Sequence, residues 1–163
     1  MKKKTTRRIA NSIDRTLNSS AFQALTIGIP FCAFKLLFGL LALRVSEGAG
    51  PLFVFAWLIL AWATVDLAMN LTRIGYSLAL RSAPIEYCTL AQAGRLVDHP
   101  RLFLAIDTLI SFSIICFVLW SGWITRLAAG EAYFWYAATT MNLISVSVVN
   151  IWVELRREGK DEG

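Results

Sequence analysis

The chain has 163 residues, of which 56% belong to the hydrophobic set and only 17% are charged. Ordinary soluble domains carry about 25% charged residues, so this composition argues against one. The net charge of +5 does not indicate nucleic-acid binding, because the basic residues are spread out and no base-reading groups accompany them. We expect most of the chain to lie in lipid, with anionic headgroups as partners of the basic residues.

Four long apolar runs cover residues 21–43, 52–74, 102–125 and 132–153. Each is close to the ~20 residues that a helix needs to cross a ~30 Å hydrocarbon core. The sequence therefore predicts an all-α integral membrane protein, with four antiparallel transmembrane helices in a bundle over residues 21–153. Short turns after the first and third runs should pair the first helix with the second and the third with the fourth.

The segments outside these runs are short and polar. Residues 1–20 are basic and suit an amphipathic helix at the membrane interface, although a solvated tail fits them nearly as well. Residues 154–163 form a charged tail. The loop 75–101 is long enough for a second interfacial helix or a partner-docking surface, and its apolar positions have helical spacing at Tyr87, Leu90, Ala91 and Gly94.

Orientation follows from the basic residues, because cytoplasmic flanks retain Lys and Arg during insertion. Thirteen of them lie before the first run, around the loop 75–101 or after the fourth run, against two, Arg44 and Arg126, in the outer turns. We expect a multi-pass protein of the inner (plasma) membrane with both termini in the cytoplasm.

The second run carries polar side chains on one face. At 100° per residue, Trp62, Asp66, Asn70, Arg73 and Ser77 fall within about 80° of one another. A carboxylate facing lipid costs roughly 2.5 to 3.5 kcal/mol, so this stripe should face protein or water. Depth counting puts Asp107 near the level of Asp66, and the predicted intramembrane polar cluster is Asp66, Asn70, Arg73, Asp107 and Asn150.

Lys35 is the remaining charge inside a run. Its face of the first helix carries the small residues Gly28, Gly39 and Ala42, which let helices approach closely. A second polar site of Lys35 and Asn142 is one interpretation, with Asp66 somewhat deeper, and snorkelling to the outer surface is the other. Pro30 should bend the helix just before Lys35.

The sequence lacks the residues that several common kinds of functional site require. His99 is the single histidine, so one chain cannot supply two histidine ligands to a haem, and no zinc-site spacing, P-loop or nucleophile motif occurs. Three cysteines without paired spacing suggest buried thiols. We expect no cofactor, no metal and no enzymatic activity.

The buried charges admit two interpretations. They can be structural, holding helices in register, or they can mark a proton or ion path. Four helices leave little room for a gated cavity, so we expect a non-enzymatic scaffold, accessory or binding subunit, self-associating or joined to a larger complex. The alternative is a small oligomeric channel or proton-coupled carrier using Asp66, Asp107 and Lys35, and a membrane-embedded enzyme is the third choice.

Overall fold

The computed structural model describes residues 19–79 and 83–161, and within these ranges every regular element is helical. In chain order the elements are α2 (Ser20–Gln23), η1 (Ala24–Gly28), α3 (Ile29–Val45), α4 (Gly50–Leu78), α5 (Thr89–Gly94), η2 (Arg95–Val97), α6 (Pro100–Trp120), η3 (Trp123–Arg126) and α7 (Ala129–Asp161). Most of the expected N-terminal interfacial segment, residues 1–18, and the last two residues of the tail lie outside the described residues.

Four helical stretches are long and apolar enough to cross a membrane, namely Ser20–Val45, Gly50–Leu78, Pro100–Trp120 and Ala129–Leu155. They coincide with the four predicted runs, and the prediction of an all-helical membrane protein is confirmed at this level. The fourth stretch has the lowest mean hydropathy, 1.3 against 2.0 to 2.5 for the others. Of the four helices, it is therefore the one least suited to contact with lipid on every side.

The first stretch is one continuous helix with a wide turn in it. The turn η1 is π-helical, and the N–H of Ile29 donates to the carbonyl of Ala24, five residues back. Pro30 follows directly and has no N–H to donate. A single π turn beside a proline is a known way to absorb the missing bond without ending the helix. Where the sequence predicted a bend before Lys35, the helix has a π turn and is locally widened.

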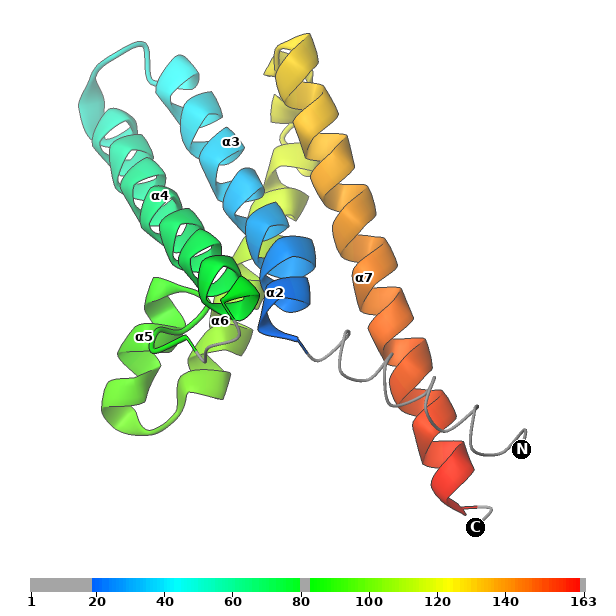
Figure 1. Cartoon of the computed structure of the whole chain (residues 1–163). Helices are drawn as coiled ribbons and strands as arrows, with labels where there is room; N and C mark the ends of the chain where they lie inside the picture. The colour runs from blue at the N-terminus through cyan, green and yellow to red at the C-terminus, as the bar shows by residue number, and fades with distance from the viewer. Residues whose placement is uncertain (1–18, 80–82, 162–163) are drawn as a thin grey trace.

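Helix α3 lies at the centre of the molecule and contacts α4, α6 and α7 (Figure 1). Its side chains are mostly buried, including Phe34 and Leu41, which have no exposed surface. The three surrounding helices bury only narrow faces and expose apolar side chains such as Leu58, Leu109 and Leu143. This pattern is expected where lipid covers the outside.

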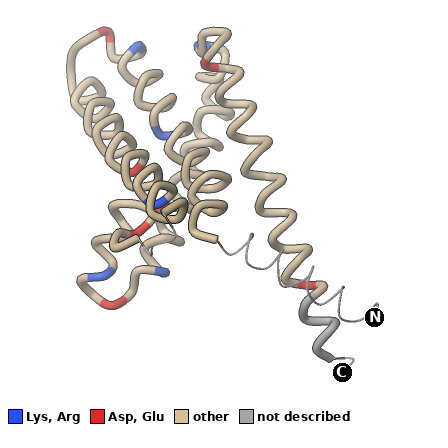
Figure 2. The backbone as a smooth tube through the Cα atoms, in the orientation of Figure 1, with Lys and Arg blue, Asp and Glu red and all other residues tan. Residues whose placement is uncertain are grey.

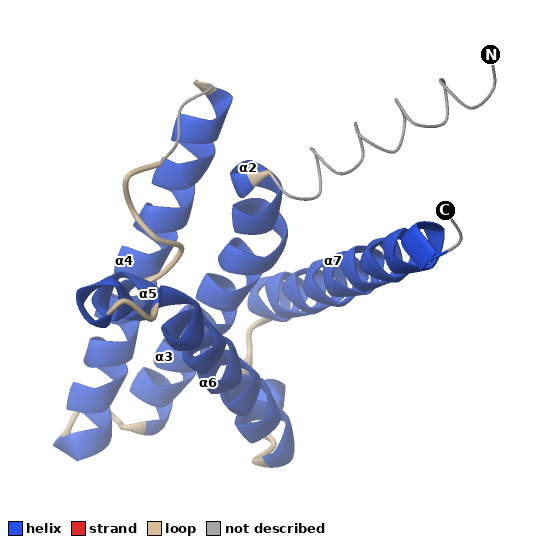
Figure 3. Ribbon diagram, turned by 90° about the horizontal axis from the view of Figure 1, so that it is seen from below, coloured by secondary structure: helices blue, strands red, loops and turns tan. Residues whose placement is uncertain are grey.

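Helices α6 and α7 make few direct contacts, although only a short connection joins them. Both pack on α3, and α7 diverges from the other helices toward its C-terminal end (Figures 1 and 3). The expected pairing of the first two spans is seen in the extensive contact of α3 with α4, whereas the last two spans meet mainly through α3.

The two ends of the molecule differ. One end, here the turn end, carries the turn 46–49 and the connection 121–128, and the other, the loop end, carries residues 83–99 (Figure 1). At the turn end Arg44 binds Glu131 through two hydrogen bonds of 2.7 and 2.6 Å, which ties α3 to α7. Charged residues concentrate toward the two ends, apart from a small group between them (Figure 2).

At the loop end the short helix α5 packs on the start of α6. A Cβ added at Gly94 would lie 2.8 Å from the Cβ of Phe103, so this contact needs a glycine. The sequence pattern predicted a helix here, and the helix spans Thr89–Gly94. Pro100 is the first residue of α6, His99 is its N-cap, and Asp98 adopts a left-handed conformation.

Candidate functional site

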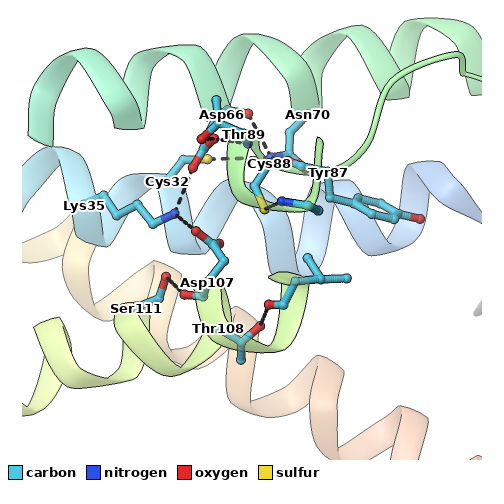
Figure 4. Close-up of polar contacts among 12 residues, drawn as sticks. Cys32, Lys35, Asp66, Asn70, Tyr87, Cys88, Thr89, Asp107, Thr108 and Ser111 are labelled. Atoms are coloured by element: carbon cyan, nitrogen blue, oxygen red, sulfur yellow. Dashed lines mark hydrogen bonds and ion pairs between the residues drawn. The ribbon is translucent and has the colours of Figure 1, made fainter. Parts of the chain in front are cut away.

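Three charged side chains from three different spans meet in the interior. The Nζ of Lys35 donates to Oδ2 of Asp66 at 2.8 Å and to Oδ1 of Asp107 at 2.5 Å (Figure 4). The Lys35 ammonium also lies 4.2 Å from the ring centroid of Trp62. All three charged residues are buried, at 1%, 0% and 4% exposure respectively. We call Lys35, Asp66 and Asp107 the charged triad.

The position of the triad follows from the central place of α3. Lys35 lies well inside this helix, and its side chain is buried and does not reach either surface. Asp107 lies ~10 Å along α6 from Pro100, and Asp66 lies ~18 Å along α4 from Leu78. The two acids reach the same ammonium because α4 extends further toward the loop end than its apolar run.

The second oxygen of Asp66 binds the loop that follows α4. Oδ1 accepts the backbone N–H of Thr89 at 2.7 Å and the Thr89 hydroxyl at 2.9 Å. With the bond from Lys35 on Oδ2, both carboxylate oxygens of Asp66 have donors. A buried carboxylate is tolerated when its lone pairs are satisfied in this way.

Asn70 and Arg73 continue the same stripe and bind the same loop. Asn70 Nδ2 donates to the carbonyl of Tyr87 at 2.8 Å, and Arg73 donates to the carbonyl of Ile85. The guanidinium of Arg73 also stacks 3.7 Å from the ring centroid of Tyr87 and binds the Ser20 hydroxyl at 3.1 Å. Non-helical backbone at this depth needs such internal partners.

These contacts form a ladder. Loop residues 85, 87 and 89 bind α4 residues 73, 70 and 66 in turn, so the loop runs back along α4 in the opposite direction. The sequence predicted the stripe on α4, but its partners were expected on other helices. The one sequence feature that pointed to this pairing is that the stripe lies near the C-terminal end of the second run, directly before the loop.

The remaining predicted site residues, Asn142 and Asn150, make no hydrogen bond to the triad within the described part of the chain. Asn142 is buried on α7, and its Oδ1 has no hydrogen-bond partner among the described residues. Asn150 is exposed on α7 and does not join the cluster. Asn70 Oδ1 packs against Gly28, where an added Cβ would overlap it, and it too lacks a partner within the described part of the chain.

Two thiols flank the triad. Cys32 accepts a 3.7 Å contact from Asn70 Nδ2, and Cys88 is the N-cap of α5, where its sulfur accepts the N–H of Ala91 at 3.4 Å. Burial, together with the nearby carboxylate of Asp107, raises the pKa of Cys88 to about 12. At neutral pH the Cys88 thiol is therefore protonated and a weak nucleophile.

The triad can do two things chemically. One ammonium and two carboxylates leave one negative charge if all three ionise, so the site can either cross-link three helices or hold a proton. A metal site is not indicated, since the described residues include no group of three His, Cys, Asp or Glu side chains placed to hold an ion.

A separate groove of about 420 Å³ lies between the first span, α6 and α7. Its lining is mostly apolar, and no member of the charged triad takes part in it. The lining residues are Gln23, Ile27, Gly28, Phe31, Tyr87, Leu104, Thr108, Phe112 and Val146.

Comparison with known proteins found no matching family model, no similar curated protein and no similar solved structure. The class that the structure defines is an all-helical membrane protein with four candidate spans. Its function must be argued from its own residues.

Proposed function

We propose that this protein is a non-enzymatic scaffold or accessory subunit of a membrane complex, which associates with another transmembrane helix, of a partner or of a second copy, through the outward face of α7. We place it in the inner (plasma) membrane as an antiparallel bundle with both termini in the cytoplasm. The distribution of Lys and Arg supports this orientation, since thirteen flank the loop-end segments and two the turns.

The observation that carries the proposal is a set of polar side chains on that outward face, where they lie among exposed apolar ones such as Leu143. Thr140, Ser147 and Asn150 are exposed and fall within about 80° of one another. The face buried against the rest of the molecule, with Trp135, Asn142 and Ser145, is on the opposite side of the helix. Polar side chains in a span are costly toward lipid and commonly mediate contacts between helices.

The charged triad supports a structural role for the molecule's interior. Both oxygens of Asp66 and the ammonium of Lys35 already have partners within the chain. Such a set links α3, α4, α6 and residues 83–89, here called the return loop, into one unit. Helix α7, which carries the outward polar side chains, packs on this unit through α3.

The double variant Ser147→Leu/Asn150→Leu tests the proposal. We expect it to remain folded and to lose the native association, because the polar contacts to the neighbouring helix are gone. Native mass spectrometry after gentle detergent extraction measures the mass of the assembly. Ser113→Leu is the matched control, since Ser113 is exposed on α6 and its hydroxyl bonds only to the Leu109 carbonyl. An unchanged assembly in the double variant would contradict the proposal.

The second candidate is a small proton- or ion-coupled carrier, favoured by the uncompensated carboxylate of the triad. Its test is flux into liposomes. If the triad is structural, Asp107→Asn and Asp66→Asn lower thermal stability without changing flux. Flux present in the native protein and abolished in a folded Asp107→Asn variant would favour the carrier instead.

A further inference from the structure

The groove between the first span, α6 and α7 has no role in the function proposed above. It exists because α7 packs on α3 and η1 but barely contacts α6. Phe31 and Phe112 meet edge to face at 5.5 Å on its lining. Phe112 and Val146 are partly open to the outside of the helices, at 42% and 38% exposure, so the groove communicates with the bilayer. Its volume lies within the range of small-molecule sites.

The groove has a polar end and an apolar end. Near the loop end the Tyr87 hydroxyl donates to Gln23 Oε1 at 2.8 Å, and both residues line the groove. From there the α6 wall runs through Leu104 and Thr108 to Phe112, ~12 Å further along the helix. This gradient matches a molecule that has a polar head and an apolar tail.

A basic residue continues the α6 wall beyond the polar end. Arg101 precedes Leu104, Thr108 and Phe112 by three, seven and eleven residues, which places all four within about 80° on one face of α6. Arg101 is exposed, and no carboxylate in the described part of the chain pairs with it. Arg73, whose guanidinium stacks on Tyr87, likewise binds only neutral groups among the described residues.

We propose that this groove binds one acyl chain of an anionic glycerophospholipid, with the lipid phosphate held at Arg101. The phosphate supplies an anion for Arg101, which no carboxylate among the described residues provides, and guanidinium groups bind phosphate well. A quinone or other neutral isoprenoid has no charge to place there. An apolar helix of a partner likewise has no anion to place beside Arg101.

The experiment uses photoreactive lipids and the full-length protein in nanodiscs of phosphatidylcholine. One probe is phosphatidylglycerol with a diazirine on its acyl chain, and the other is phosphatidylcholine with the same chain. We expect both to label groove residues between 104 and 112 and at Val146, mapped by mass spectrometry. The phosphatidylglycerol probe should label them about five-fold more, the effect of one arginine at a membrane surface.

Two variants with matched controls separate the head from the tail. Arg101→Gln should abolish the preference for phosphatidylglycerol, while Arg126→Gln, the same change at the turn end, should keep it. Thr108→Phe should fill the groove and suppress labelling by both probes. Ser113→Phe should not suppress labelling. It is a matched control, because the hydroxyls of Thr108 and Ser113 each donate to the carbonyl four residues back. Arg101 is exposed, so its variant tests the site without disturbing the fold.

Equal labelling by the two probes, or an undiminished preference in Arg101→Gln, would overturn the headgroup assignment and with it the proposal. Labelling spread evenly over the exposed face of α6, with Thr108→Phe and Ser113→Phe alike, would also overturn it and indicate ordinary annular lipid. These outcomes test the groove separately from the proposed association through α7, because Ser147 and Asn150 do not line the groove.

Discussion

Lys35 is a single ammonium shared between two carboxylates, and both bonds are short. In a low-dielectric interior each carboxylate depends on this ammonium, because removing one member of a buried ion pair leaves an uncompensated charge. Lys35 lies on α3, which contacts α4, α6 and α7, and its exposure is 1%. The triad therefore couples the positions of three helices through one side chain.

We expect Lys35→Met to destabilise the protein by about 3 to 5 kcal/mol, the usual cost of breaking a buried pair. The measurement is unfolding in a detergent series followed by circular dichroism. The variant Lys35→Met/Asp66→Asn/Asp107→Asn should lose less than Lys35→Met alone, since no unpaired carboxylate remains. Equal stability of Lys35→Met and the native protein would contradict a structural triad.

Cys88 provides a prediction on pH. Burial raises the pKa of Cys88 to about 12, against 9.0 for an ordinary thiol. At pH 8 its alkylation by iodoacetamide should be about 1,000-fold slower in the folded than in the unfolded protein, because the thiolate population falls tenfold for each unit of pKa. Peptide mass spectrometry measures the rate at Cys88 separately from the other thiols.

The raised pKa of Cys88 also makes the free energy of unfolding depend on pH. The folded state holds the proton more tightly, so this contribution is fully present below about pH 9 and is lost as the pH rises toward 12. Cys88→Ala should remove that part of the alkaline decline in unfolding free energy. A Cys88→Ala protein with the same alkaline profile as the native protein, or rapid alkylation at pH 8, would show that the thiol is not buried.

At the scale of elements, close approach of the first span to α4 depends on glycine. A Cβ at Gly28 would lie 2.6 Å from Cγ of Asn70, and a Cβ at Gly39 would lie 2.7 Å from Cγ of Leu60. Asn70 cannot retreat freely, because its Nδ2 holds the carbonyls of Tyr87 and Asp66. The packing of two helices and the position of the return loop are thus set at one point.

Gly28→Ala should cost about 1 to 3 kcal/mol by overpacking and should loosen the return loop. Thermal unfolding measures the first effect, and hydrogen exchange over residues 83–89 measures the second. Gly75→Ala is the control: Gly75 is also helical, nothing lies within 4 Å of its added Cβ, and alanine there should be neutral or stabilising by about 0.5 to 1 kcal/mol. Equal behaviour of the two variants would count against the packing described.

At the scale of the whole molecule, the helices are joined at two levels of different strength. The buried triad joins α3, α4 and α6, whereas Arg44 and Glu131 join α3 to α7 at the turn end with side chains 45% and 20% exposed. Exposed pairs contribute little because water screens them. The position of α7 along most of its length therefore depends on its apolar contact with α3, including Phe34 against Trp135 at 5.0 Å.

Arg44→Gln should lower the unfolding free energy by no more than about 1 kcal/mol, far less than Lys35→Met. Its effect should shrink further at 1 M salt, where the screening length is about 3 Å. Unfolding curves at low and high salt measure this. Trp135→Ala is the comparison for α7, with an expected loss of about 3 to 5 kcal/mol from the buried ring. A larger loss from Arg44→Gln than from Trp135→Ala would reverse this ranking.

The sequence by itself determined that the chain is helical and that four stretches can span a membrane, because length and apolar composition alone decide this. It also determined that Asp66, Asn70 and Arg73 share one face, since helical periodicity is local. The equal depth of Asp66 and Asp107 followed from counting residues.

Only the tertiary structure decided what these groups touch. The first span became the central helix, which placed Lys35 between Asp66 and Asp107 rather than with Asn142, and α7 turned Asn150 outward. The polar stripe on α4 bonds mainly to backbone atoms of the return loop. Because every residue carries these atoms, no sequence pattern shows which residues will be the partners. The face that each helix turns inward, and the helices it packs against, depend on many weak contacts summed over the whole molecule. No local sequence pattern therefore encodes them.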